Sequence, residues 1–302
     1  MTRAVNVYGG VAVWHFIYLP CDRLIFVGYA GHYMANIAPR QNPRPPGQCI
    51  FCGRTGVTHE HLFSDWLREL FPRSKDDSHT LARLIAWTPR PTFSRRIKQG
   101  HSGTRTVRKI CRRCNSGWLS LIDDGARNFA IPLIRGEAVT VTVTAQRALA
   151  TWLAKIAMVA NSHDPKTSVV LQVDRDWIRK QSLPPIVWQI WMGFYDGVGW
   201  RELAMQHHSG ILHFTSVGDP ETLSGYASAT TLGLGRMLTL IVGTEFPNME
   251  VNLGLANQML RRIWPARDSF TWPLGHAITD DEAGAIARII HEAVANPRPP
   301  AD

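Results

Sequence analysis

Apolar residues recur at helical spacing in several stretches of this sequence. On that basis we expect helices at residues 62–71, 115–129, 144–161 and 279–294. Pro72 ends the first of them, because proline cannot continue a helix. Thr144 is expected to cap the third helix, and Thr279 with Glu282 forms a capping box at the start of the last.

Alternation of apolar and polar residues predicts strands between these helices. The expected strands cover residues 104–110, 139–143, 186–194, 211–216 and 237–242. We expect residues 73–103 to form a loop-rich insertion. Helices and strands that follow one another in mixed order predict an α+β fold.

The composition changes at two places along the chain, which suggests three segments. Residues 39–47 are rich in proline and read as a linker. Residues 1–47 are therefore expected to be an extension and linker, whose order the sequence leaves open. Residues 48–128 are expected to form a first module, and residues 129–302 a second α+β domain that selects a substrate or a partner.

Basic residues are concentrated in the first part of the chain. Residues 1–128 contain 19 Lys or Arg and 8 Asp or Glu, whereas residues 129–302 contain 14 and 16. Residues 78–122 include ten basic residues and no acidic one. This stretch is either a solvated basic face or a surface that follows nucleic-acid phosphates. On the second explanation, the candidate nucleic-acid-binding residues are Arg95, Arg96, Lys98, Arg105, Arg108, Lys109, Arg112 and Arg113.

Four of the five cysteines form two CxxC pairs, Cys49 with Cys52 and Cys111 with Cys114. Paired spacing with an odd total favours metal binding in a reducing compartment over a disulfide framework. Four thiolates make a closed tetrahedral zinc site, which is structural because it leaves no open position. The alternative is four unrelated structural cysteines.

Chemically versatile residues lie beside each cysteine pair. Glu60 and His61 follow the first pair closely, and Asn115 comes directly after Cys114. Zinc would tie the two stretches together and bring these three side chains into one neighbourhood. A carboxylate and an amide carbonyl suit Mg²⁺ or Mn²⁺. A neutral histidine beside that ion can take a proton from water.

The combination of CxxC, an acidic residue followed by histidine, and CxxCN resembles the HNH, or ββα-metal, endonucleases. The most similar variant is the endonuclease VII-like group, in which four cysteines bind zinc. The resemblance covers about 75 residues. It implies a ββα-metal finger in which His61 is the general base, Glu60 and Asn115 hold the catalytic metal, and a DNA phosphodiester is hydrolysed to leave 5′-phosphate ends.

The sequence departs from this family in three ways. The acidic residue is glutamate where aspartate is more usual, and the insertion between His61 and Cys111 is long. The family's middle asparagine has no counterpart that we can assign. Asp123 is a weak further candidate for the metal, because on a regular helix it lies off the face that carries Asn115.

We therefore expect a metal-dependent DNA endonuclease with structural Zn²⁺ and catalytic Mg²⁺ or Mn²⁺, acting on DNA or RNA. A zinc-stabilised module that binds nucleic acid without cutting it is the first alternative, and an interaction protein dominated by residues 129–302 is the second. The apolar stretch at residues 7–20 is followed too soon by Asp22 and Arg23 to span a membrane. We thus expect a cytoplasmic protein.

Overall fold

The structure is a computed structural model of the 302-residue chain. It describes residues 14–16, 26–28, 47–72, 78–87, 91–99, 105–163, 168–215, 222–246, 251 and 253–295. Within these ranges, only the backbone is described for residues 14–16, 26–28, 60, 78–87, 91–99, 210–215, 222–224 and 289–295. The predicted extension at residues 1–47 therefore lies mostly outside the described residues, except for the short paired strands β1 (Trp14–Phe16) and β2 (Phe26–Gly28).

A small antiparallel sheet and a long helix form the part of the chain around the cysteines. β3 (Val57–His61) pairs with β6 (Thr106–Cys111), where alternation predicted a strand. The chain then passes through α2 (Arg112–Cys114) and the π-helical turn η2 (Asn115–Leu119) into α3 (Ser120–Arg135). The helix that we expected to stop near residue 129 therefore continues to Arg135.

The helix expected at residues 62–71 is largely wrong, because only α1 (Leu67–Leu70) is helical. Leu62, Phe63 and Trp66 are buried all the same, from an irregular segment that precedes α1. Ser64 is buried among them and is hydrogen-bonded to side chains of other helices. A serine held in this way competes with regular helix formation. The apolar residues of this segment are therefore spaced by the need to bury them in the core and not by a helical repeat.

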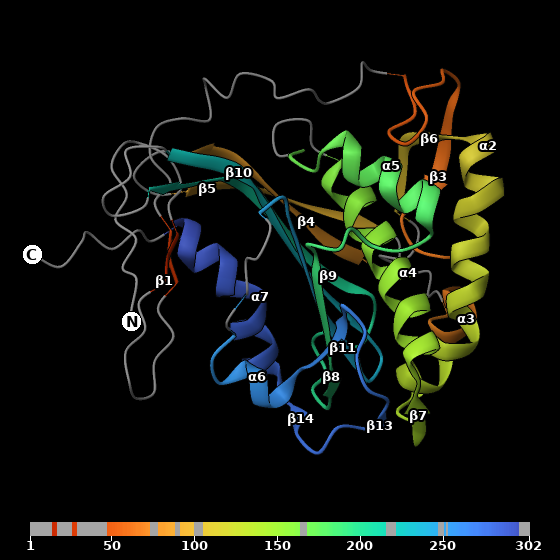
Figure 1. Cartoon of the computed structure of the whole chain (residues 1–302), viewed down its shortest axis with the longest axis vertical. Helices are drawn as coiled ribbons and strands as arrows, with labels where there is room; N and C mark the ends of the chain where they lie inside the picture. The colour runs from red at the N-terminus through yellow and green to blue at the C-terminus, as the bar shows by residue number, and fades with distance from the viewer. Residues whose placement is uncertain are drawn as a thin grey trace, which may run out of the picture.

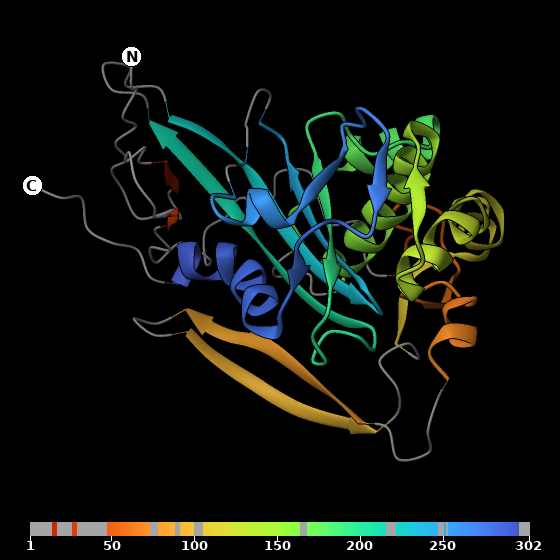
Figure 2. The same cartoon turned by 90° about the horizontal axis from the view of Figure 1, so that it is seen from below.

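The loop-rich insertion expected at residues 73–103 is also wrong, because it contains a long hairpin. β4 (Ser78–Trp87) pairs antiparallel with β5 (Pro91–Gln99), with an irregularity between Leu84 and Ala86. The two strands form a separate two-stranded sheet. In Figure 2 the hairpin runs along one edge of the molecule, below α7 and the larger sheet. The strand pattern was not visible in the sequence, because apolar residues lie on both faces of β4 and two arginines are adjacent in β5.

The larger sheet has six strands in the order β12-β8-β11-β10-β9, with β14 parallel to β8. Its strands are β8 (Gln189–Tyr195), β9 (Ala204–Thr215), β10 (Thr222–Leu234), β11 (Met237–Thr244), β12 (Arg261–Trp264) and β14 (Ala277–Ile278). Three of these overlap the strands that we expected at residues 186–194, 211–216 and 237–242: β8 begins three residues later, β9 begins seven residues earlier, and β11 covers the whole expected range. The polar composition of β10 concealed a central strand.

Both faces of this sheet are covered, which explains why all of β11 is buried. Met237 and Ile241 belong to the larger hydrophobic cluster, and Leu238 and Leu240 to a second one. Alternate residues of one strand thus serve two cores, as the two-residue period of a strand requires. Figure 1 shows α4 on one face of the sheet and α7 on the other.

The helices that cover the sheet agree in part with the sequence. α4 (Val143–Asn161) and α7 (Asp280–Ala295) were expected, but α5 (Gln172–Gln181) and the short α6 (Ala256–Met259) were missed. Thr142, not Thr144, caps α4 by accepting from the backbone N–H of Ala145. β7 (Val139–Val141) pairs with β13 (Phe270–Trp272) beside these helices.

The capping box before α7 is confirmed, since Thr279 Oγ1 accepts from the backbone of Glu282 while the Glu282 carboxylate accepts from the backbone N–H of Thr279. Mixed helices and strands likewise confirm the α+β class. The larger hydrophobic cluster contains Cys49 and Phe51 as well as Trp188 and Trp272. Residues of both predicted segments, 48–128 and 129–302, therefore share one core.

Candidate functional site

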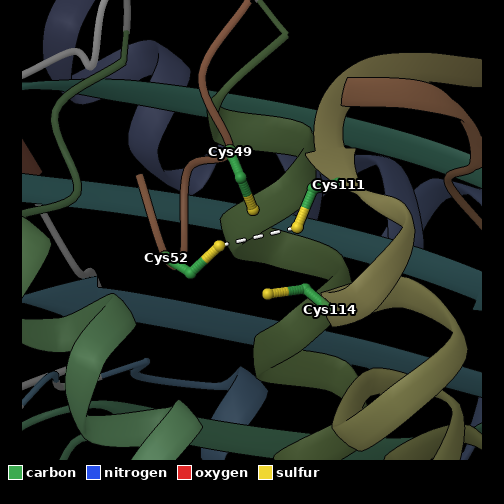
Figure 3. Close-up of side chains that lie close together, drawn as sticks. All are labelled: Cys49, Cys52, Cys111 and Cys114. Carbon is green, nitrogen blue, oxygen red and sulfur yellow. Dashed lines mark hydrogen bonds between the residues drawn. The ribbon is translucent and has the colours of Figure 1, made fainter. Parts of the chain in front are cut away.

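The four cysteine thiols converge on one point (Figure 3). The sulfurs of Cys49, Cys52, Cys111 and Cys114 all lie within 4.8 Å of one another, and those of Cys52 and Cys111 are 3.5 Å apart. A tetrahedral zinc ion with Zn–S bonds of about 2.3 Å requires sulfurs about 3.8 Å apart. The cluster is therefore positioned to hold a metal ion and is compatible with structural zinc.

Local backbone geometry shapes each half of the cluster. Cys49 and Cys52 lie on a tight turn, where the N–H of Gly53 donates to the carbonyl of Cys49 and Gly53 has a φ of 75°. Glycine adopts this left-handed conformation without steric cost. Cys111 ends β6 and Cys114 lies within the first helical turn after it. The N–H of Ile50 donates to the carbonyl of Lys109, which joins the two halves.

Burial governs the protonation of these thiols in the absence of a cation. It raises the pKa of Cys49 and of Cys114, because a buried thiolate loses hydration. Burial also opposes ionisation of Cys52, but hydrogen bonds from the Arg54 backbone and the neighbouring cysteines outweigh it and lower its pKa to about 7. A metal ion that binds here must displace thiol protons, so its affinity falls as the pH falls.

A cavity of about 530 Å³ is lined by Ile110 and Asn115, the chain neighbours of Cys111 and Cys114. His61, at the end of β3, and Asn115, at the start of η2, both line it. Carboxylates of Asp65, Glu69, Asp123 and Asp124 and the cations of Arg127 and Lys155 line it as well. The cavity thus combines an imidazole, an amide and several charged groups, which is a suitable composition for binding a charged substrate.

Glu60 lies in β3 opposite Val107, next to His61 in the chain. Its side chain falls outside the described part of the structure, so its predicted role as a metal ligand stays a prediction. Among the described residues, the four cysteines are the only group of three or more His, Cys, Asp or Glu side chains close enough to share an ion. Asn115 is partly buried and opens the π-helical turn.

His61 is held by a residue that the sequence did not single out. Arg68, which follows in α1, donates from its guanidinium to Nε2 of His61 at 2.6 Å and to Oδ1 of Asp65 at 2.7 Å. Arginine can only donate, so Nε2 accepts and carries the lone pair of a neutral imidazole. The His61 side chain is 34% exposed and Arg68 is 41% exposed. Solvent and a ligand can both reach this pair.

A polar network closes the inner wall of the cavity. Asp123 in α3 accepts from Ser64 Oγ at 2.6 Å and from Lys155 Nζ in α4 at 2.5 Å. Trp152 Nε1 donates to Ser64 Oγ at 2.8 Å. Asp123 lines the same cavity as Asn115. We had expected it to lie off the helix face that carries Asn115. The break in helical geometry at Gly117, within η2, changes the phase between the two residues.

One member of this network could have been found from the sequence, because Lys155 stands among the apolar residues of α4. Lys155 is only 6% exposed, which is unusual for lysine unless it is paired. Of the predicted nucleic-acid contacts, Arg108, Arg112 and Arg113 are exposed and Arg105 and Lys109 are partly buried. None of these five lines the cavity. The side chains of Arg95, Arg96 and Lys98 lie outside the described ones.

No helix in the described part of the chain is long and apolar enough to cross a membrane. Comparisons of the chain with protein-family models, with curated proteins and with solved structures gave no match.

Proposed function

We propose that this protein is a metal-dependent endonuclease that hydrolyses DNA phosphodiester bonds. The observation that carries the proposal is the single cavity lined by both His61 and Asn115, next to a cysteine cluster that joins the segments on which they lie. Residues 54 positions apart in the sequence border one space, and a metal ion held by the four cysteines would fix the elements that carry them. The resemblance of the motifs to HNH nucleases supports the same assignment.

In this proposal, Nε2 of His61 takes a proton from the attacking water. The water oxygen bonds to phosphorus while the bond to the 3′ oxygen breaks, and the leaving oxygen takes a proton from solvent. Asn115 and Glu60 are the proposed ligands of one Mg²⁺ or Mn²⁺ ion, whose charge would stabilise the developing charge on the phosphate. The amide oxygen of Asn115 is a hard ligand, which fits these ions.

Arg68 must release His61 before this step, because its guanidinium occupies the lone pair that would accept the proton. A phosphodiester offers oxygens that match a guanidinium well. We therefore propose that the Arg68 guanidinium moves from His61 to the substrate phosphate. This movement would free Nε2 of His61 to act as the base only when DNA is bound. Asp65, which also holds Arg68, keeps the guanidinium near the cavity.

The test is nicking of supercoiled plasmid by the full chain with Mg²⁺ or Mn²⁺. We expect His61→Ala to reduce the rate by about 10²-fold or more, the typical contribution of a general base, and Asn115→Ala to reduce it strongly. His59→Ala is the matched control, since His59 lies on the same strand, is exposed and does not line the cavity. Each variant must keep its zinc content and melting temperature.

Equal nicking by wild type and His61→Ala would contradict the assignment. The second candidate function is a zinc-stabilised module that binds DNA without cutting it, and the hydrogen bond that occupies His61 Nε2 favours it. That function predicts salt-sensitive binding of duplex DNA, with no nicking by the wild type in either metal.

A further inference from the structure

The two faces of the β4–β5 hairpin differ in charge. Directly paired residues of an antiparallel ribbon lie on the same face, and so do alternate residues of each strand. The pairs His79–Lys98, Leu81–Arg96 and Arg83–Ser94 therefore share one face. The pairs Thr80–Ile97, Ala82–Arg95 and Leu84–Phe93 share the other. We call the first set of six residues the cationic face.

The register separates two neighbours that the sequence alone treats as equivalent. By register, Arg96 and Lys98 share the cationic face with Arg83, whereas Arg95 belongs to the opposite face, whose other residues are mostly of apolar type. Burying several cations would cost far more than burying the apolar face. The cationic face is thus the one suited to a ligand, and because residues 78–122 contain no Asp or Glu, we infer that this ligand is an anion.

The dimensions of the ribbon favour duplex DNA over other polyanions. Alternate residues of a strand are about 6.8 Å apart, which equals the rise of two nucleotides, about 3.4 Å each, along the axis of B-form DNA. A two-stranded ribbon also fits the major groove of B-form DNA, about 12 Å wide. The major groove of double-stranded RNA is too narrow and deep for such an element.

The position of the hairpin in the chain places this face near the candidate site. The hairpin follows α1 and precedes β6, and both of these segments border the cavity that His61 lines. Six residue steps separate Pro72 from Ser78, which can span at most about 22 Å. DNA held by the ribbon would therefore lie within reach of the cavity.

We propose that the cationic face of the β4–β5 hairpin binds the phosphates of duplex DNA along its groove. The inference rests on the proposed function in taking DNA as the substrate, and it adds the element and the residues that hold the duplex. His79, Arg83, Arg96 and Lys98 are assigned as contacts. Arg95, predicted from the sequence as a contact, is excluded.

The experiment measures binding of a fluorescent DNA duplex to full-length protein carrying His61→Ala, without added Mg²⁺ or Mn²⁺. The dissociation constant is measured between roughly 50 and 200 mM salt. Arg96→Gln is compared with Arg95→Gln, a matched pair of adjacent residues on opposite faces. We expect Arg96→Gln to reduce the salt slope by about 0.9, the value for one phosphate contact, and Arg95→Gln to leave it unchanged.

A triple variant, R83Q/R96Q/K98Q, should reduce the slope by about 2.7 and weaken binding at least about tenfold. Zinc content and melting temperature show whether each variant is folded. Equal effects of Arg95→Gln and Arg96→Gln, no effect of the triple variant, or tighter binding of double-stranded RNA would each overturn the inference.

Because cleavage is absent from this assay, its result is independent of the nuclease test. A wild type that does not nick, together with face-dependent binding, would refute only the proposed catalysis. Nicking that persists with no difference between the two hairpin faces would refute only the assignment of the hairpin.

Discussion

Asp174 shows how strongly one buried residue can link stability to pH. Its carboxylate accepts from the hydroxyl of Tyr226, which in turn accepts from Trp188 Nε1 at 2.9 Å. Burial raises the pKa of Asp174 to about 6, helped by the nearby charge of Glu245, while Tyr226, Arg175 and Trp188 act in the opposite direction. Only 8% of the residue is exposed.

A raised pKa in the folded state implies stability that is present at low pH and lost as the pH rises. The pKa of this carboxyl group is 3.8 in the unfolded chain and about 6 in the folded protein. As the pH rises through this interval, the free energy of unfolding should fall by roughly 3 kcal/mol because of Asp174. Urea unfolding between pH 4 and pH 7 measures the loss. Asp174→Asn should lack it, so parallel stability curves for the two proteins would contradict the prediction.

At the same scale, the sequence singled out some residues of the candidate site and missed others. The cysteines, His61 and Asn115 stand out because their spacing is itself a pattern. Ser64 and Arg68 are common residue types with no distinctive spacing, and only its place among apolar residues of a helix marks Lys155 in the sequence. Their importance depends on which groups they meet, and those groups lie in other elements.

At the scale of elements, the contact between α3 and α4 depends on an ion pair in a largely buried place. Lys155 and Asp123 side chains are 7% and 20% exposed. Lys155→Met removes one partner and leaves a carboxylate in poor contact with water. We expect a loss of about 3 kcal/mol in the free energy of unfolding, measured by urea denaturation.

Two comparisons test that prediction. Adding Asp123→Asn to Lys155→Met should cost less than the two single substitutions together, because the uncompensated charge is gone. Arg127→Met is the matched control on the same cavity wall. Its ion pair with Glu69 is exposed on both sides, and its loss should cost less than about 1 kcal/mol. Equal losses for Lys155→Met and Arg127→Met would be inconsistent with a buried pair.

Elements also show where sequence patterns mislead. The apolar residues at 62–71 have helical spacing, yet most of that segment is irregular, because Ser64 and its partners fix the backbone. The β4–β5 hairpin was missed because apolar residues lie on both faces of β4, and Arg95 and Arg96 are adjacent in β5, so neither strand shows a clean apolar-polar alternation. In both cases the spacing of apolar residues alone did not predict the secondary structure, because contacts with other parts of the chain decided it.

At the scale of the whole molecule, the cysteine cluster and the larger sheet belong to one hydrophobic core. If the four cysteines hold zinc as we propose, its loss should therefore affect residues well beyond 48–128. Cys111→Ser should cost at least about 3 kcal/mol, which for a chain of this size lowers the melting temperature by roughly 5 °C. Calorimetry should show one transition that shifts as a unit.

The wild type must contain close to one zinc ion per chain by elemental analysis for this prediction to hold. Two separate transitions, of which only one responds to Cys111→Ser or to a chelator, would instead indicate that residues 129–302 unfold independently. Cys111→Ala serves as a second variant, because it removes the ligand without adding a hydroxyl group to a buried site.

The sequence by itself determined the α+β class, the four cysteines that are positioned to hold a metal ion, the strand before Cys111 and the capped helix α7. These features arise from local periodicity and from short motifs, whose physical causes lie within a few residues. Only the tertiary structure decided that α3 and α4 close the cavity with an ion pair, that Arg68 covers His61, and that Arg95 and Arg96 lie on opposite faces of a ribbon. Such contacts and registers join distant segments, and they are fixed by packing and strand pairing across the whole chain.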